Sequence, residues 1–152
     1  MFHENQIVFW EDSFSSKNEV IHHLTHRENS AVRDADQYER DVLEREASFA
    51  TYTIDGVAMP HAKSEGVSAP FVAFARLKTP VRWGTEEGED ARMVFLIGVP
   101  KVGGTADNNL HLKILAALSK KLIHDEFRAQ LSTANSTKDI YALLQEIEGA
   151  LR

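Results

Sequence analysis

The sequence predicts an α/β protein, a three-layer α/β/α sandwich with a mixed central sheet. Two short, unbroken apolar runs, at residues 71–75 and 93–97, are bounded by proline or glycine, which is typical of central strands covered on both faces. Amphipathic helical patterns lie both before and after these runs, so helices are available for both faces of the sheet. Strands and helices do not alternate strictly, which disfavours a doubly wound parallel fold.

The first third of the chain predicts one strand followed by two helices. Residues 7–10 form a short apolar run, which indicates a strand. Residues 16–19 have the S-x-x-E pattern of a capping box, so we expect a helix to begin there and to end near residues 28–30. A second helix is expected from about Asp34 to Glu46.

The remainder predicts the other strands and three more helices. Between the two apolar runs, residues 78–84 predict a turn with at most an edge strand, and Thr85 to Asp90 predict a solvated acidic loop to which we assign no function. The three helices are expected after a cap at Asn108 or Asn109, around residues 127–131, and after a cap at residues 136–139.

Composition favours one domain, spanning residues 1–152 with its core at about 7–149. The chain has 152 residues and is 43% hydrophobic, which suffices for one well-buried core. With 17 basic against 23 acidic residues, and no basic run longer than Lys120-Lys121, neither nucleic acid nor an anionic membrane is expected as the main partner.

The absence of cysteine excludes disulfides, thiol nucleophiles and thiolate metal ligands from this chain. The N-terminal residues lack the pattern of a signal peptide, and the longest apolar run is too short to cross a bilayer. We therefore expect a cytoplasmic protein.

One histidine, His61, follows a segment whose backbone is stiffened. Gly56 permits a positive φ, while Pro60 fixes its own φ and restricts Met59 to extended geometry. These backbone restrictions would limit the imidazole of His61 to a narrow range of orientations. The alternative is that Gly56 and Pro60 only shape a turn and that His61 is a solvated surface residue, which the local pattern alone favours.

Two further residues suit the binding of an anion. His111 lies in the first turn of a predicted helix, where unpaired N–H groups and the helix dipole favour negative charge. Arg45 carries a planar guanidinium that matches phosphate oxygens. Taken singly, His111 could equally be a core-edge histidine bonded to a carbonyl, and Arg45 a surface ion-pair residue.

The histidines of the first predicted helix suggest a metal site. His22 and His26 have the i, i+4 spacing of zinc ligands, but His23 stands where H-E-x-x-H sites have glutamate. No third ligand follows in the sequence. We therefore interpret this segment as a solvated helix face and expect neither a metal nor a cofactor.

The segment around His61 carries a resemblance that extends over nearly the whole chain. It rests on Arg45-Glu46, on Gly56 to Ala62 with the pattern G-x-A-x-P-H-[AG], and on Ala69-Pro70, Pro80 to Gly84, Val94 to Ile97 and Leu110-His111-Leu112. In these motifs the chain resembles the IIA component of the phosphoenolpyruvate-dependent sugar phosphotransferase system (PTS), of the fructose/mannitol type (EIIA type 2).

The resemblance implies a phosphocarrier. His61 would accept a phosphoryl group from the phosphorylated histidine of the carrier HPr and pass it to a cysteine of a IIB component, and through IIB to a membrane IIC permease. His111 and Arg45 would be the active-site residues that stabilise the phosphoryl group. The fold implied is a mixed sheet between helical layers. The sugar and the oligomeric state do not follow from the resemblance.

Two alternative functions stay open, and the chain departs from the family pattern at two places. A regulatory phosphoprotein of the nitrogen-related IIA branch would share the same histidine but act by binding proteins. An inactive binding domain would be expected to lack His61, which is present. Met59 stands where the family often has isoleucine or valine, a volume-conserving change, and the loop from Thr85 to Asp90 is long and acidic.

Overall fold

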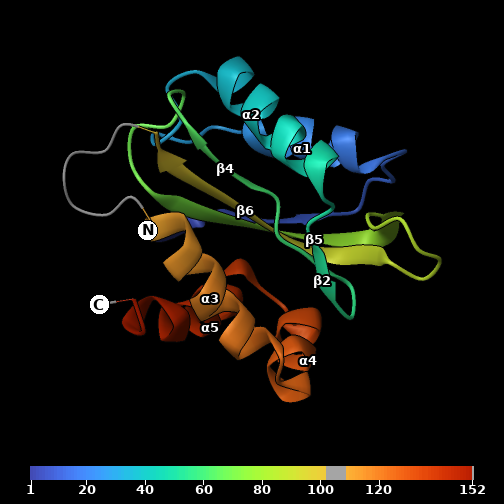
Figure 1. The fold of residues 1–152 in the computed structure, drawn as a ribbon. Helices are drawn as coiled ribbons and strands as arrows, with labels where there is room; N and C mark the ends of the chain where they lie inside the picture. Colours follow the sequence, from blue (N-terminus) through green and yellow to red (C-terminus); the bar gives the residue numbers. More distant parts are fainter. Residues whose placement is uncertain (102–108, 152) are drawn as a thin grey trace.

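The protein is a mixed β-sheet between two layers of helices, as the sequence predicts (Figure 1). The computed structural model describes residues 1–101 and 109–151. The strands are β1 (Phe2–Trp10), β2 (Tyr52–Ile54), β3 (Val57–Ala58), β4 (His61–Ser64), β5 (Phe71–Arg82) and β6 (Asp90–Pro100). The helices are α1 (Lys17–Thr25), α2 (Ala35–Ser48), α3 (Leu110–Leu122), α4 (Asp125–Thr133) and α5 (Thr137–Gly149).

The sheet runs in the order β1-β5-β6-β3-β2, and β4 pairs with β6 further along the same edge as β3. The β5–β6 and β2–β3 pairs are antiparallel, whereas β1–β5, β3–β6 and β4–β6 are parallel. The two apolar runs thus form the central pair, as predicted. Their strands are buried on both faces because helices cover both sides.

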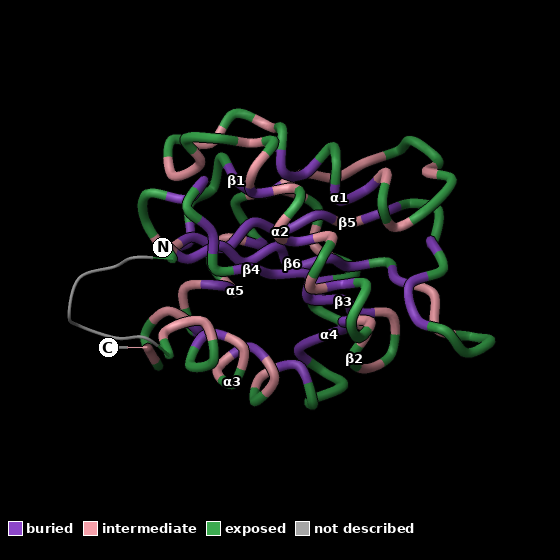
Figure 2. Tube along the Cα trace, turned by 45° about the horizontal axis from the view of Figure 1, so that its top comes forward, coloured by how far each residue is buried: buried purple, intermediate pink, exposed green. Residues whose placement is uncertain are grey.

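Helices α1 and α2 cover one face of the sheet, and α3, α4 and α5 cover the other (Figure 1). Two separate hydrophobic cores result, one on each face, and Figure 2 shows the buried segments concentrated in the strands between them. Alternation along a strand divides its side chains between the cores: Phe74 packs toward α3–α5, whereas Ala73 and Ala75 pack toward α1 and α2.

The sequence predictions fail at two strands. Residues 78–82 continue β5, so the turn expected at 78–84 is wrong. The pairing of β5 with β6 is irregular between Arg76 and Val81. Pro80 lies in this irregular stretch, so its lack of a backbone N–H removes no regular hydrogen bond between the strands. Strand β1 begins at Phe2 rather than near Ile7, and its polar stretch falls at a register shift between these two residues.

The predicted helix caps at Ser16 and Ser136 are confirmed, and Asp34, expected only as the start of a helix, is a third cap. Ser16, Asp34 and Ser136 each accept a hydrogen bond from the backbone N–H three residues later, at 3.2, 3.0 and 3.1 Å. Helix α1 ends at Thr25, earlier than expected. Asn109 is the N-cap position of α3, without a side-chain bond to the helix, and Asn108 lies outside the described residues.

The strands β2 and β3 form a tight hairpin that leads to His61. Its two turn residues, Asp55 and Gly56, have positive φ values of 38° and 85°, which is the Asp-Gly signature of a two-residue hairpin turn. After Ala58 the strand is interrupted at Met59 and Pro60 and resumes as β4 with His61. The expected positive φ at Gly56 is confirmed, and the turn places β3 beside β6.

Within the described part of the chain, the helices are all too short or too polar to traverse a lipid bilayer. The acidic loop keeps Thr85 to Gly88 exposed, as expected. It is closed by the carbonyl of Glu89, which accepts hydrogen bonds from the backbone N–H groups of Trp83 and Gly84.

Candidate functional site

His61 is a buried strand residue, with only 8% of its surface exposed. It opens β4 and pairs with Ile97 of the central strand β6. Across the strand, Tyr38 of α2 donates a hydrogen bond to the Ile97 carbonyl at 2.7 Å, which ties the helix to the sheet at this level. The interpretation of His61 as a solvated turn residue is therefore wrong, because Pro60 interrupts a strand that continues past it.

The ring of His61 is oriented by the backbone. Its Nδ1 lies 2.8 Å from the carbonyl oxygen of Met59, in the two-residue gap between β3 and β4. A carbonyl oxygen only accepts hydrogen bonds, so Nδ1 carries the proton and Nε2 of the neutral ring carries the lone pair. Nε2 is thus the ring nitrogen available for reaction.

The surroundings of His61 favour the neutral imidazole. Burial lowers its pKa, and the nearby Arg45 guanidinium lowers the pKa further. The hydrogen bond to Met59 and the Glu46 carboxylate act in the opposite direction, but the net pKa lies below the usual value for histidine. His61 is therefore deprotonated at neutral pH.

A cavity of about 480 Å³ opens beside His61 at the edge of the sheet. It brings together three residues that the sequence singles out from distant segments: Arg45 from α2, His61 from β4 and His111 from α3. The full lining is Asp41, Glu44, Arg45, Ser48, His61, Ala62, Lys63, Lys101 and His111.

Arg45 lies in the last turn of α2, and its Nη1 donates a hydrogen bond to the Phe49 carbonyl at 2.8 Å. That bond spans the end of the helix, where the last carbonyls lack intrahelical partners and a cation is favoured by the dipole. Arg45 forms no ion pair among the described residues. The alternative interpretation of Arg45 as a surface ion-pair residue is therefore not supported. Arg45 lines the cavity instead.

His111 lies in the first turn of α3, as predicted, and is half-buried. Its Nδ1 is buried and meets no hydrogen-bond partner among the described residues. The alternative of a core histidine satisfied by a carbonyl is therefore not supported. Burial lowers the pKa of His111, and the positive charge of Lys63 and the neighbouring His61 lower it further.

Sequence reasoning missed two features of this site. Lys63 lines the cavity, and the two-residue period of a strand could have placed it on the same side as His61. Glu46 is buried. It continues the i, i+4 spacing of Tyr38 and Val42, and this spacing could have placed it on the inner face of α2.

The buried carboxylate of Glu46 holds the connection that follows α2. It accepts hydrogen bonds from the backbone N–H of Thr51 at 2.7 Å and from its hydroxyl at 2.6 Å, and it pairs with Lys17 at 3.1 Å. The Thr51 hydroxyl also accepts a bond from the indole N–H of Trp83. This network fixes the chain segment between Arg45 and the hairpin that leads to His61.

Chemically, the cavity combines a neutral, oriented imidazole with positive side chains. Arg45, Lys63 and Lys101 surround the imidazole, while Asp41 and Glu44 lie on the α2 side of the lining. Such an arrangement suits a nucleophile that receives an anionic group, whose charge the cations stabilise.

The described residues do contain one group with the geometry of metal ligands, but it lies elsewhere. His22, His26 and Glu39 gather their ligand atoms within 4.8 Å of one another. The statement that no third ligand follows His22 and His26 is therefore wrong. Glu39 belongs to the next helix, and only the packing of α2 against α1 brings it there.

The fold and the cavity are those of a histidine-containing α/β/α sandwich suited to group transfer, and comparison with known proteins specifies the class. Residues 1–147 match the family described as the phosphoenolpyruvate-dependent sugar phosphotransferase system, EIIA 2. The chain is 37% identical over 116 residues to the PTS system fructose-specific EIIA component of Haloferax volcanii, which covers 76% of this chain and 73% of that protein.

Solved structures agree with this match. The nitrogen regulatory protein IIA-Ntr from Neisseria meningitidis has a TM-score of 0.82 and 25% identity, covering 94% of this chain and 95% of that chain. A complex of enzyme IIAMTL and phosphorylated enzyme IIBMTL from Escherichia coli contains a chain of the same fold, with a TM-score of 0.77, 24% identity, and coverage of 96% and 99%.

The chain therefore belongs to the EIIA type 2 family of the phosphoenolpyruvate-dependent sugar phosphotransferase system. Proteins of this family relay phosphoryl groups.

Proposed function

We propose that this protein is a cytoplasmic phosphocarrier that accepts a phosphoryl group from phospho-HPr on Nε2 of His61. It passes the group to a cysteine of a IIB component, which serves a membrane IIC permease for a fructose- or mannitol-like sugar. The observation that carries the proposal is the buried hydrogen bond from His61 Nδ1 to the Met59 carbonyl. That bond leaves Nε2 as the nucleophile and fixes the direction from which it attacks.

The transfer exchanges one nitrogen–phosphorus bond for another. The lone pair of Nε2 attacks phosphorus in line as the bond to the ring nitrogen of the donor histidine breaks, and the bonding pair leaves with that donor ring. The proton of His61 stays on Nδ1, hydrogen-bonded to the Met59 carbonyl, whose partial negative charge stabilises the positive charge that develops on the ring. Positioning and electrostatics supply most of the rate enhancement for such a step.

The neighbours of His61 have separate roles in this proposal. Arg45 stabilises the phosphoryl oxygens through its guanidinium, which matches them in geometry and charge. His111 supplies a further hydrogen bond, for which its unpartnered ring nitrogen is available. The ammonium of Lys63 adds positive charge at the same opening.

Exposed apolar side chains next in sequence to the cavity residues Ser48 and His111 support a protein as the donor and the acceptor. Phe49 follows α2 and is 76% exposed, and Leu112 lies beside His111 and is 53% exposed. Exposed large apolar side chains next to a reactive group are typical of interaction surfaces. The similar IIA chain in the complex with phosphorylated enzyme IIBMTL is consistent with a IIB partner for this protein.

The test is to measure phosphoryl uptake by the mass of the intact protein. The protein is incubated with phosphoenolpyruvate, enzyme I and HPr, and the mass is expected to rise by one phosphoryl group that is labile in acid and stable in base. His61→Gln should take up none, whereas His124→Gln, a change at an exposed histidine, should behave as wild type. Uptake by His61→Gln equal to that of wild type would refute the assignment.

His111 is tested by separating the two transfers. We expect His111→Ala to slow onward transfer to IIB more than the initial uptake from phospho-HPr, because its hydrogen bond orients the phosphoryl group on His61 for attack by the IIB cysteine. Rapid-quench measurements of each half-reaction give the two rates. Equal slowing of both steps would remove this role.

A regulatory protein of the nitrogen-related branch is the second candidate, favoured by the similarity to IIA-Ntr. Both candidates need the phosphorylated histidine, so uptake alone does not separate them. The phosphorylated protein is mixed with a fructose-type IIB domain, and phosphocysteine is measured by mass. Transfer within seconds supports the transport role, whereas uptake by His61 without any transfer to IIB supports the regulatory one.

A further inference from the structure

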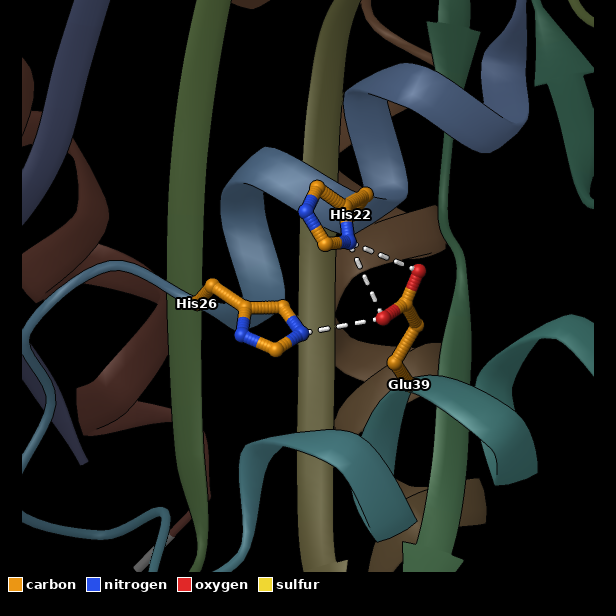
Figure 3. A group of neighbouring side chains, drawn as sticks. All are labelled: His22, His26 and Glu39. Carbon is orange, nitrogen blue, oxygen red and sulfur yellow. Dashed lines mark hydrogen bonds and ion pairs between the residues drawn. The ribbon is translucent and has the colours of Figure 1, made fainter.

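A second histidine cluster lies on the outer surface of the α1–α2 layer, away from the cavity at His61. Figure 3 shows His22 and His26, one helical turn apart, pointing toward the carboxylate of Glu39 on α2. The two imidazole rings lie 4.4 Å apart between centroids. The proposed phosphoryl transfer uses none of these residues.

The distances within the cluster match those of a metal site. Nδ1 of His22 lies 3.0 Å from both carboxylate oxygens of Glu39, and Nε2 of His26 lies 2.9 Å from one of them. Ligands bound at about 2.0 Å in a tetrahedral zinc site are separated by roughly 3.3 Å. Only small side-chain adjustments are therefore needed for the three groups to share one ion.

A fourth donor is within reach. Asp36, one turn before Glu39 on α2, has an oxygen 3.5 Å from Nε2 of His26, and its side chain is 77% exposed. The remaining coordination position can thus be filled by this carboxylate or by water. The Glu39 side chain, by contrast, is only 19% exposed and is held between the two rings.

The neighbouring charges do not compete with a cation. His23 packs edge-on against His22 and Trp10 and at a tilt against Phe14, and it does not belong to the group of ligand atoms. Arg40 also lies on α2, but its guanidinium is hydrogen-bonded to Gln37. Two imidazoles and the Glu39 carboxylate therefore face the same point, with the Asp36 carboxylate beside His26.

We propose that His22, His26 and Glu39, assisted by Asp36, bind one zinc ion that links α1 to α2. Mixed imidazole and carboxylate donors favour zinc and its neighbours in the transition series, whereas magnesium and calcium prefer sites made wholly of oxygen. The ion replaces hydrogen bonds that already hold the helices together, so its expected effect is to stabilise this helix pair. The proposal is independent of the phosphoryl transfer at His61.

The test is zinc binding by the chelator-treated full chain. Calorimetric titration with zinc chloride is expected to show one ion bound per chain, and saturating zinc is expected to raise the melting temperature by roughly 5 °C. Magnesium at the same concentration should leave the melting temperature unchanged. In the imidazole NMR spectrum, the signals of His22 and His26 should shift on zinc addition.

Variants locate the ion. His26→Ala, at an exposed position, and Glu39→Gln, which keeps the shape of the side chain, should each weaken zinc binding by at least about 10-fold. The double variant His61→Gln, His111→Gln should retain it, since it removes only the histidines of the cavity. Wild type that binds no zinc, or His26→Ala and Glu39→Gln variants that bind it as wild type does, would overturn the proposal; circular dichroism verifies that each variant is folded.

Discussion

The two histidine clusters of this protein use the same side chain in opposite surroundings. At the sheet edge, His61 is buried, bonded to a backbone carbonyl and flanked by Arg45. On the helical surface, His22 and His26 are more exposed, and both turn toward the carboxylate of Glu39. Cationic neighbours suit the first cluster for an anionic group, and anionic neighbours suit the second for a cation.

Helix α2 contributes to both clusters. Its first half supplies Asp36 and Glu39 to the cluster on the surface, and its last turn supplies Arg45 to the cavity. This distribution follows the helix dipole, which favours acidic groups near the N-terminus and basic groups near the C-terminus. The comparison teaches that the charged neighbours of each cluster, rather than the histidines, decide which ligand it fits: Arg45, Lys63 and Lys101 at the cavity, and Glu39 and Asp36 at the surface.

The largest expected effect comes from removing the cation of the cavity. Arg45→Ala should slow phosphoryl uptake by about 100-fold or more, because one preorganised group that stabilises the transferring phosphoryl is lost. Arg45→Lys should recover only part of the rate, since it keeps the charge without the planar fork. Rapid-quench kinetics measure both, and zinc binding should not change.

Arg40→Ala is the matched control, because Arg40 lies on the same helix and bonds only to Gln37 among the described residues. If Arg45→Ala took up phosphate as fast as Arg40→Ala, the contrast between the two clusters would lose its main support.

A smaller effect is expected at the carboxylate behind the cavity. Glu46→Gln should lower the free energy of unfolding by about 3 kcal/mol, because it leaves Lys17 without its buried partner and weakens the bonds to Thr51. Urea denaturation measures the change. Glu44→Gln, at an exposed position of the same helix, should change stability by less than about 0.5 kcal/mol, and equal effects at both positions would contradict the role of the network.

The buried cluster should also make stability depend on pH. Burial lowers the pKa of His61 in the fold, so the unfolded chain takes up its proton first as the pH falls below about 6.5. The stabilising contribution is complete above that pH and is lost as the pH falls toward the lower pKa of the folded state. This histidine contributes a slope of at most about 1.4 kcal/mol per pH unit.

Urea denaturation between pH 5 and 7.5, roughly the range in which histidine titrates, measures that slope. His61→Gln should reduce it, and His124→Gln should not. A wild-type slope that His61→Gln leaves intact would show that this residue is not the titrating group.

The smallest effect is expected at the outermost donor of the surface cluster. Asp36→Asn should weaken zinc binding only about 3-fold, because this carboxylate is largely exposed and water can replace it. Calorimetric titration with zinc compares the affinity of this variant with that of Glu39→Gln. A loss as large as that of Glu39→Gln would make Asp36 a full ligand and would correct the order of donors proposed above.

Much of the fold could be predicted because it depends on local signals. The caps at Ser16 and Ser136, the start of a helix near Asp34 and the positive φ at Gly56 depend on neighbouring residues, so the sequence locates them. The central strands were found because both faces are buried and the apolar runs are unbroken. The errors fall where pairing overrides local pattern, as at Pro80, which the irregular β5–β6 ladder accommodates.

The candidate site likewise has features that local sequence signals indicate and features that depend on tertiary contacts. The importance of His61, Arg45 and His111 could be suspected from their motifs, but their common cavity depends on the contact of α2, β4 and α3. The burial of His61 was missed because Pro60 resembles the end of a strand, whereas β4 resumes pairing with β6 immediately after it. Glu39 could not be recognised as a partner of His22, since only tertiary packing joins their helices.

The hydrogen bond from Tyr38 to the Ile97 carbonyl has a consequence for motion. Burial raises the pKa of Tyr38 well above its ordinary value, so its hydroxyl remains a donor. The Ile97 amide is in turn bonded to the Pro60 carbonyl, next to His61. The Tyr38 bond thus adds the packing of α2 to the strand pairing that protects the Ile97 amide, so this part of the chain should be among the slowest segments to exchange hydrogen for deuterium.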